Sequence, residues 1–355
     1  DAELADFLAY LDQKVGKGNY LIFLSADHGG MHNANVMKEH KIPADGYAAW
    51  RNTWDAGAWR AYFEERKKQG DTRGPRRQVY ASTLMLVKRG RYHTASGGLV
   101  ELGRIVNPQA QADNVFVDHE ITLRPSLERN SGQVRIAVVN DDCLALARRL
   151  HATDPTDDIC VLNMASSSNP GGGVWGGAGA QEEYLFRCTD YYRFLYQYAN
   201  NFDPQAYHVQ RNAHHRYPLA PLYGGIYSHG VTVFRDTEAN GYALLDSPVR
   251  LNFVAVAAFH FNERCDAIPQ PYVEPTKDKI RLMLRLAANN GQRRLVLGAF
   301  GCGAFHNEPH HMAQLFRQVI HESEFQGLFT SISFAVIEDH NSTNNYTAFR
   351  DVLEG

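Results

Sequence analysis

The sequence predicts an α/β fold in which helices cover both faces of a mixed sheet, in three layers. Five short, almost uninterrupted apolar runs are typical of strands that are buried on both faces: Val134–Val139, Ile159–Met164, Phe253–Ala258, Leu295–Phe300 and Ile332–Ile337. Helical patterns alternate with these runs, at Leu144–Leu150, Glu182–Tyr198, Lys277–Ala288 and Met312–Ile320. Two glycine-rich segments follow predicted strands, which is where open α/β sheets bind their ligands.

Upstream of these strands the pattern is helical. An amphipathic helix is predicted over Ala58–Gly70, and a second helix begins after Pro75 and ends at Gly90. We therefore expect three parts: an N-terminal segment (residues 1–50), a helical extension (51–130) and the α/β/α domain (131–355).

Composition narrows the classes of function. The 355 residues carry a formal net charge of −3, which argues against a general nucleic-acid-binding surface. No apolar run approaches the length of a bilayer-spanning helix, so no membrane partner is expected. The five cysteines include no Cys-x-x-Cys pair and predict buried, reduced thiols in a cytoplasmic protein. The first residue is Asp rather than Met, which leaves room for residues upstream of it.

The segment from residue 169 to residue 183 is the most informative part of the chain. It contains seven candidate site residues: Asn169, Gly171, Gly172, Gly173, Gln181, Glu182 and Glu183. Successive glycines adopt positive φ cheaply, and their amides can form a concavity that binds anions. A phosphate site beside adjacent carboxylates predicts acid catalysis on a phosphorylated ligand. The alternative is a plain strand–helix connection with acids in the first helical turn. No Gly-Lys-Ser/Thr follows, so a P-loop nucleotidase is disfavoured.

A second glycine-rich loop follows the predicted strand Leu295–Phe300. Its candidate substrate-binding residues are Gly301, Cys302, Gly303, Ala304 and Phe305. An ordinary turn at the end of a strand is the alternative. Cys302 has no evident base partner, so we expect a structural thiol rather than a nucleophile.

Two further groups of polar residues have simpler explanations. Asp141 and Asp142 follow the first strand, and helix N-capping accounts for one of these acids. His306 and His310 are four residues apart, but no third ligand stands at a telling spacing, so we expect no metal site.

These motifs resemble the signature of the microbial poly(ADP-ribose) glycohydrolases, a macrodomain-related family in which three glycines and a short spacer precede Gln-Glu-Glu. Further matching landmarks are Val138–Asp142, Leu162–Ala165, Tyr223–Tyr227 and Leu297–Phe305, and the resemblance runs from about Trp54 to the C-terminus. It implies a macrodomain-like fold with an N-terminal helical extension and hydrolysis of ribose–ribose bonds without a cofactor or metal. Its implied partners are poly(ADP-ribose), ADP-ribose and ADP-ribosylated proteins. A non-catalytic ADP-ribose-binding module is the alternative.

The resemblance also implies individual roles. Glu183 is the acid that protonates the departing hydroxyl, Glu182 contacts a ribose hydroxyl, and Gln181 supports the site. The second loop closes over the diphosphate with Phe305 against the distal ribose. Asp141 is the candidate partner of the adenine amino group.

The N-terminal segment carries a separate resemblance. Tyr20–Gly29, which contains Asp27 and His28, resembles a fragment of an alkaline-phosphatase-type phosphodiesterase, in which such an Asp-His pair ligates zinc. A two-zinc phosphatase needs more ligands and a nucleophile from a much larger domain. We therefore expect an appended segment or fusion remnant without a working metal site.

Overall fold

The computed structural model describes residues 64–94, 96–102, 114–156, 158–200, 207, 209–338 and 344–355. Asp27, His28 and the first six residues of the predicted helix Ala58–Gly70 lie outside these residues, and positions 64–68 are helical. Within the described part of the chain, no helix is long and apolar enough to cross a membrane.

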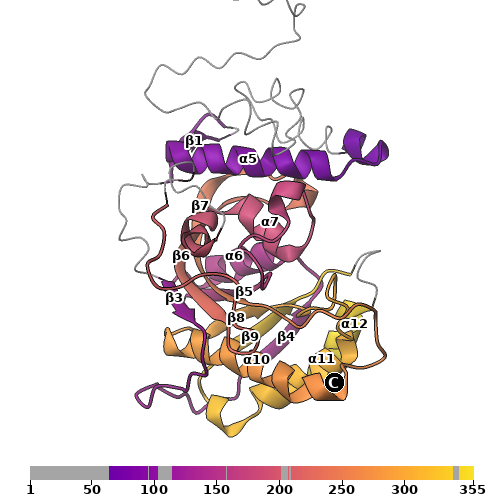
Figure 1. Cartoon of the computed structure of the whole chain (residues 1–355). Helices are drawn as coiled ribbons and strands as arrows, with labels where there is room; N and C mark the ends of the chain where they lie inside the picture. The colour runs from indigo at the N-terminus through magenta and orange to yellow at the C-terminus, as the bar shows by residue number, and fades with distance from the viewer. Residues whose placement is uncertain are drawn as a thin grey trace, which may run out of the picture.

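A seven-stranded mixed sheet forms the middle layer, as predicted (Figure 1). Its spatial order is β3 (Asn114–Val117), β6 (Gly225–Arg235), β7 (Leu244–Val256), β5 (Ile159–Met164), β8 (Arg294–Leu297), β9 (Ser331–Ala335) and β4 (Arg135–Val139). The five strands from β7 to β4 are parallel, and β6 and β3 add an antiparallel edge. A small hairpin, β1 (Arg91–His93) with β2 (Leu99–Glu101), precedes the sheet in the chain.

Helices cover both faces of the sheet and bury two apolar cores. One core packs under α5 (Arg73–Arg89), α6 (Cys143–Thr153), α7 (Gln181–Cys188) and α8 (Tyr192–Leu195). The other packs under α10 (Gln270–Asn289), α11 (Pro309–Ile320) and α12 (Asn345–Leu353). Figure 1 shows these two groups of helices on opposite sides of the sheet. The predicted three-layer α/β/α architecture is therefore confirmed.

The helix α5 ends where the sequence predicted. Gly90 adopts the left-handed conformation with φ of 69°, and its amide donates to the carbonyls of Leu86 and Val87. Glycine adopts this conformation without the penalty that a Cβ would bring. The edge strand β3 lies within the stretch that we assigned to the helical extension, and the division of the chain at residue 130 stays a prediction.

The long helix predicted over Glu182–Tyr198 is wrong, because the chain breaks at Thr189 and Asp190. Thr189 forms a bridge with Val233 of β6, and Asp190 exchanges hydrogen bonds with Thr232. Pairing with a strand removes these two backbone groups from the helical ladder, which periodicity alone cannot reveal. The chain then resumes as α8 and the single turn η3 (Tyr196–Tyr198).

The antiparallel strands were also hidden from the sequence. The strand β6 begins at Gly225, within the landmark Tyr223–Tyr227, and runs to Arg235. The strand β7 begins at Leu244, well before the predicted Phe253. The sequence missed its first half because that half is only partly buried and has no continuous apolar run.

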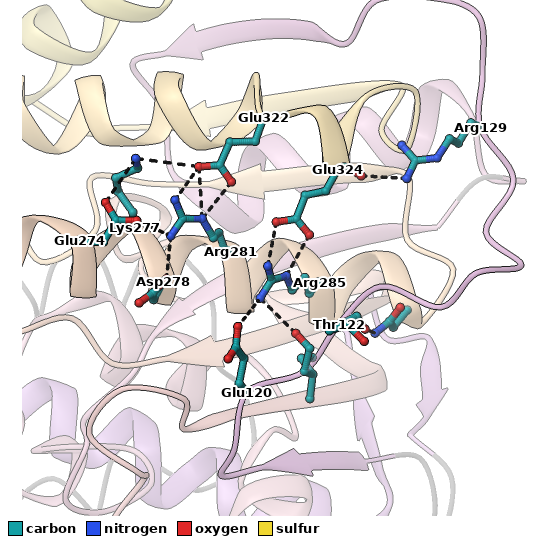
Figure 2. Close-up of polar contacts among 12 residues, drawn as sticks. Glu120, Thr122, Arg129, Glu274, Lys277, Asp278, Arg281, Arg285, Glu322 and Glu324 are labelled. Carbon is teal, nitrogen blue, oxygen red and sulfur yellow. Dashed lines mark hydrogen bonds and ion pairs between the residues drawn. The ribbon is translucent and has the colours of Figure 1, made fainter.

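A row of ion pairs ties α10 to the connection between α11 and β9 (Figure 2). Arg281 makes a two-pronged contact with Glu322, and Arg285 makes another with Glu324. These pairs lie where α11 returns to the amino ends of the parallel strands.

Candidate active site

The two glycine-rich loops leave neighbouring parallel strands and diverge. The loop after β5 leads to α7 on one face of the sheet, and the loop after β8 leads to α11 on the other face. Open α/β sheets bind ligands outside the carboxyl ends of their strands at such a divergence. The predicted site residues are therefore brought to one edge of the sheet.

The triple glycine turns tightly around the two glutamates. Gly171 and Gly172 have φ of 77° and 49°, which favours glycine. A Cβ on Gly172 would lie 2.6 Å from Oε1 of Glu183, and one on Gly171 would lie 2.8 Å from the ring of Phe186. Close approach as well as backbone conformation therefore requires glycine at these two positions.

Glu182 is buried and held on both oxygens. The residue is only 3% exposed. Oε2 accepts from the Ser166 amide at 2.6 Å, and Oε1 accepts from the Gly171 amide at 3.1 Å and from Nδ2 of Asn163 at 3.4 Å. Glu182 thus connects β5, the glycine loop and α7.

Burial, with a smaller contribution from the neighbouring Glu183 carboxylate, raises the pKa of Glu182 to about 8. The donors on Ser166, Gly171 and Asn163 oppose this rise. The buried Oδ1 of Asn163 has no partner among the described residues. Rotation of the Asn163 amide by a half-turn would present this oxygen to a protonated Glu182.

Glu183 has one oxygen fixed and one oxygen uncommitted. Oε1 accepts from the Gly173 amide at 2.7 Å, whereas Oε2 is buried and has no hydrogen-bond partner among the described residues. The residue is 7% exposed. A buried carboxyl oxygen without a partner is costly unless a ligand or water completes its bonding, and such atoms cluster at functional sites.

Gln181 fastens the start of α7 to the strand that precedes the loop. Its Nε2 donates to the Leu162 carbonyl at 2.6 Å, and its Oε1 accepts from the Met164 amide at 2.9 Å. These bonds complete the edge of β5 beyond Val161, where its pairing with β8 ends. Gln181 therefore positions the two glutamates that follow it.

The amides of the triple glycine are used differently from our expectation. Gly171 and Gly173 donate to Glu182 and Glu183, and Gly172 donates to the Asn169 carbonyl at 3.3 Å. Asn169 in turn donates from Nδ2 to the Gly172 carbonyl at 3.0 Å. These amides orient the carboxylates instead of lying open to a phosphate, so any contact of this loop with substrate stays a prediction.

The second loop has a firm base and an exposed tip. The Cys302 thiol is 2% exposed within the core, and its amide donates to the Ala299 carbonyl at 3.0 Å. Burial raises the pKa of this thiol well above its ordinary value, which is unsuitable for a nucleophile. Gly303 and Ala304 are exposed and Phe305 is half-buried. Their amides donate to no acceptor in the part of the chain that the structure describes.

A third loop, Ala257–Phe261 after β7, supports this tip and was not identified from the sequence. The Phe261 amide donates to the Phe305 carbonyl at 3.0 Å, and Nδ2 of Asn307 donates to the Phe259 carbonyl at 2.7 Å. The ring of His260 contacts that of Phe305 edge-on, with centroids 5.3 Å apart. The only signal was the placement of Phe-His-Phe just after a buried strand.

Lys279 of α10 was also missed. It is 3% exposed, it donates to the Pro221 carbonyl, and its ammonium lies 4.6 Å from the centroid of the Phe259 ring. Burial lowers the pKa of Lys279 to about 8. This lysine joins the loop before β6 to the loop after β7.

Two acids after β4 have structural partners. Asp142 caps α6 by accepting from the Leu144 and Ala145 amides, as the N-capping explanation requires, and also accepts from the hydroxyl of Tyr184. Asp141 accepts from Nη1 of Arg149 at 2.7 Å. A contact between Asp141 and adenine stays a prediction.

The histidines near the second loop also have structural contacts. Nδ1 of His311 accepts from the Ile268 amide at 3.1 Å, and His306 contacts the Phe261 carbonyl through Nδ1 at 2.9 Å. No group of three or more potential metal ligands occurs among the residues that the structure describes.

Short matches reproduce the phosphatase resemblance of the N-terminal segment. The chain is 63% identical over 43 residues to an alkaline phosphatase, PafA, of Elizabethkingia meningoseptica. It is 61% identical over 41 residues to a calcium-transporting ATPase of Myroides odoratus. The chain spans only 8% of the length of each of these relatives.

The similarities to solved structures cover most of the chain. A poly(ADP-ribose) glycohydrolase from Thermomonospora curvata is 32% identical, covers 78% of this chain and 99% of its own, and superposes with a TM-score of 0.62. The same enzyme bound to the inhibitor ADP-HPD is 32% identical, covers 78% and 98%, and has a TM-score of 0.60. A Deinococcus radiodurans poly(ADP-ribose) glycohydrolase in complex with ADP-ribose is 34% identical over 64% of this chain and 86% of its own, with a TM-score of 0.47.

The family model for the catalytic domain of microbial-type poly(ADP-ribose) glycohydrolases matches residues 81–236, which include the glycine loop, both glutamates and β6. With relatives of 32% identity aligned along nearly their whole length, this chain belongs to the microbial-type poly(ADP-ribose) glycohydrolase family.

Proposed function

We propose that this protein hydrolyses the ribose–ribose O-glycosidic bonds of poly(ADP-ribose) and releases ADP-ribose, with Glu183 as the general acid and base. The main support for the proposal is the difference between the two oxygens of the Glu183 carboxyl group. Oε1 is fixed by the Gly173 amide, and Oε2 is buried without a protein partner among the described residues. A fixed carboxyl with one uncommitted oxygen suits proton transfer to a bound substrate.

The reaction needs two proton transfers at one place. Protonated Glu183 gives its proton to the oxygen of the departing ribose, and the glycosidic bond breaks as positive charge develops at the anomeric carbon. The resulting carboxylate removes a proton from the attacking water, whose oxygen bonds to that carbon. This cycle restores protonated Glu183 and consumes one water for each bond cleaved.

Glu182 holds the loop rather than transferring the proton. Both of its oxygens already accept from backbone amides, and it is the less exposed member of the pair. With its pKa raised to about 8 by burial, Glu182 keeps a proton at neutral pH and limits negative charge beside Glu183. The ribose hydroxyl contact that the family resemblance implies for Glu182 remains part of this proposal.

The second loop is the part that we assign to the ADP-ribose diphosphate. The amides of Gly303, Ala304 and Phe305, which donate to no acceptor among the described residues, provide donors without an added positive charge. The half-buried ring of Phe305 would pack on the distal ribose and direct the anomeric carbon toward Glu183. The substrate class is supported by the similarity to the Thermomonospora curvata poly(ADP-ribose) glycohydrolase, whose structure was determined with the inhibitor ADP-HPD.

We also propose ADP-ribosylated proteins as natural partners and the cytoplasm as the compartment. Among the described residues all five cysteines are free and four are buried, which suits a reducing environment.

The decisive experiment is incubation of the protein with poly(ADP-ribose), with and without a chelator. We expect chelator-insensitive release of ADP-ribose, and we expect Glu183→Gln to lower kcat by about 10²–10⁴ because the amide keeps the shape but not the transferable proton. Calorimetry should show that the variant still binds ADP-ribose. If the wild type binds ADP-ribose without releasing it from the polymer, the protein is a binding module and the proposal is wrong.

A further inference from the structure

We propose that Arg187 is a positioning residue for Glu183 and that it makes the N-terminal helix α5 a working part of the active site. This inference rests on the proposed function, because it concerns the residue that we assign to proton transfer. The evidence is an uninterrupted series of hydrogen bonds from α5 to the carboxyl group of Glu183.

The first part of the series lies within the connection from β5 to α7, which contains the triple glycine. Nη1 of Arg187 donates to the Ala178 carbonyl at 2.7 Å, and the Ala178 amide donates to the Gly173 carbonyl at 3.2 Å. Gly173 then donates from its amide to Oε1 of Glu183 at 2.7 Å. Arg187 therefore determines where the peptide that holds Glu183 lies, although it does not touch Glu183's uncommitted oxygen.

Arg187 is itself held by a buried tyrosine. The residue is fully buried, and its Nε donates to the hydroxyl of Tyr242 at 2.7 Å. That hydroxyl donates to Oε2 of Glu238 at 2.7 Å. Tyr242 has φ of 53°, a conformation that a bulky residue adopts only when its surroundings impose it, and that occurs preferentially at functional sites.

The series ends on α5. Glu238 receives a two-pronged contact from Arg76, with Nε at 3.0 Å and Nη2 at 2.8 Å. The same helix also lies directly against the connection from β5 to α7. A Cβ on Gly177 would lie 2.2 Å from the Arg73 carbonyl oxygen, and a Cβ on Gly179 would lie 2.3 Å from Nη1 of Arg76. Figure 1 shows α5 lying across α7.

Packing alone does not account for Arg187. Its Nη2 is buried and has no hydrogen-bond partner among the described residues. A buried guanidinium with an unpaired nitrogen is costly, and an apolar side chain would fill the same volume at lower cost. The two hydrogen bonds that the Arg187 guanidinium does make among the described residues, to the Ala178 carbonyl and to the Tyr242 hydroxyl, are those that a positioning role needs.

The chain offers a matched control in Tyr92 of β1. This tyrosine is 3% exposed, and its hydroxyl donates to the Leu245 carbonyl. Leu245 belongs neither to the series nor to the loop that orients Glu183. Tyr92→Phe therefore removes the same kind of buried hydroxyl and should lower stability without disturbing that loop.

The test compares Tyr242→Phe with Tyr92→Phe. Removal of the Tyr242 hydroxyl leaves Nε of Arg187 without its acceptor but keeps the ring in the core. We expect kcat on poly(ADP-ribose) to fall about tenfold with KM within about twofold, because small misplacement of a catalytic group acts mainly on the transition state. We expect Tyr92→Phe to keep kcat within about twofold. Hydrogen exchange of the peptide spanning residues 171–183 should accelerate in Tyr242→Phe only.

Unchanged kcat in Tyr242→Phe, or an equal loss of kcat in both variants at matched melting temperatures, would overturn the proposal. If Tyr242→Phe does not fold, Arg76→Gln interrupts the series at its solvent end and is judged by the same criteria. If the wild type has no glycohydrolase activity, the proposed function fails, and the exchange comparison still decides whether Arg187 orders the loop.

Discussion

Gly172 lies against the carboxyl group of Glu183, so closely that a Cβ on Gly172 would be 2.6 Å from Oε1. The glycine adopts φ of 49°, and the residue after it donates the amide that fixes the same oxygen. Under the proposed function, the glycine loop therefore acts on the carboxyl group that we assign to proton transfer.

Gly172→Ala should consequently disable catalysis more than it weakens binding. The methyl group displaces Glu183, and a displacement of about 1 Å can lower the rate about 100-fold. The positive φ adds a folding cost of about 1–2 kcal/mol. Steady-state kinetics and ADP-ribose calorimetry measure the two effects separately. Equal losses in kcat and affinity would mean that the loop contacts the ligand rather than the acid.

Gly303→Val should give the opposite result. Nothing lies within 4 Å of a Cβ on Gly303, and the glycine has no positive φ. The substitution is therefore expected to change the free energy of unfolding by no more than about 0.5 kcal/mol. Because the valine side chain would project from the tip of the second loop, we expect ADP-ribose affinity to fall at least about tenfold. Normal affinity in this variant would move the diphosphate away from this loop.

The carboxylate pair predicts a distinctive dependence on pH. Burial raises the pKa of Glu182 from 4.5 to about 8 on folding. The stabilising effect of its proton is therefore fully present below pH 4.5 and is lost as the pH rises through 8. We expect the melting temperature of the wild type to fall as the pH is raised from about 6 to about 9, because this interval spans the titration of Glu182. Glu182→Gln removes the ionisable group, so its melting temperature should depend less on pH over this interval. Parallel curves for the two proteins would show that Glu182 is ionised throughout.

The sequence predicted the carboxyl ends of the parallel strands well, because buried strands and glycine loops leave strong local patterns. Glu183 is singled out by the family resemblance, which assigns the acid to the second Glu of Gln-Glu-Glu. The use of its two oxygens could not be predicted, because the partner of each oxygen depends on how the loop folds back. The same holds for Arg187, whose acceptor Tyr242 is 55 residues away in the chain.

The breaks in regular structure were the least predictable part. Asp190 and Thr232 pair across 42 residues and interrupt a helical pattern that continues past them. The strand β6 begins at a pair of glycines, which signal a turn when the chain is read locally. In both places a distant backbone partner outweighs the local preference.

The ion pairs of α10 supply a prediction about stability alone. Figure 2 shows Arg281 facing Glu322, with Nε to Oε2 at 2.9 Å and Nη2 to Oε1 at 2.7 Å. The side chains are 15% and 26% exposed, so solvent screens this pair less than a surface pair. Glu322→Gln should lower the free energy of unfolding by about 1 kcal/mol in urea denaturation, and less in 1 M salt, where the Debye length is about 3 Å.

Asp351→Asn is the matched control, because Arg350 and Asp351 are 45% and 55% exposed. We expect this variant to leave the free energy of unfolding and its salt dependence unchanged within the error of the same urea denaturation. Glu322 follows α11 at the amino ends of the strands, opposite the glycine loops, so Glu322→Gln should keep the kcat and KM of the wild type. A clear loss of kcat at a temperature where the variant is fully folded would show that α11 transmits changes from that end of the sheet to the second loop, because α11 begins directly after that loop.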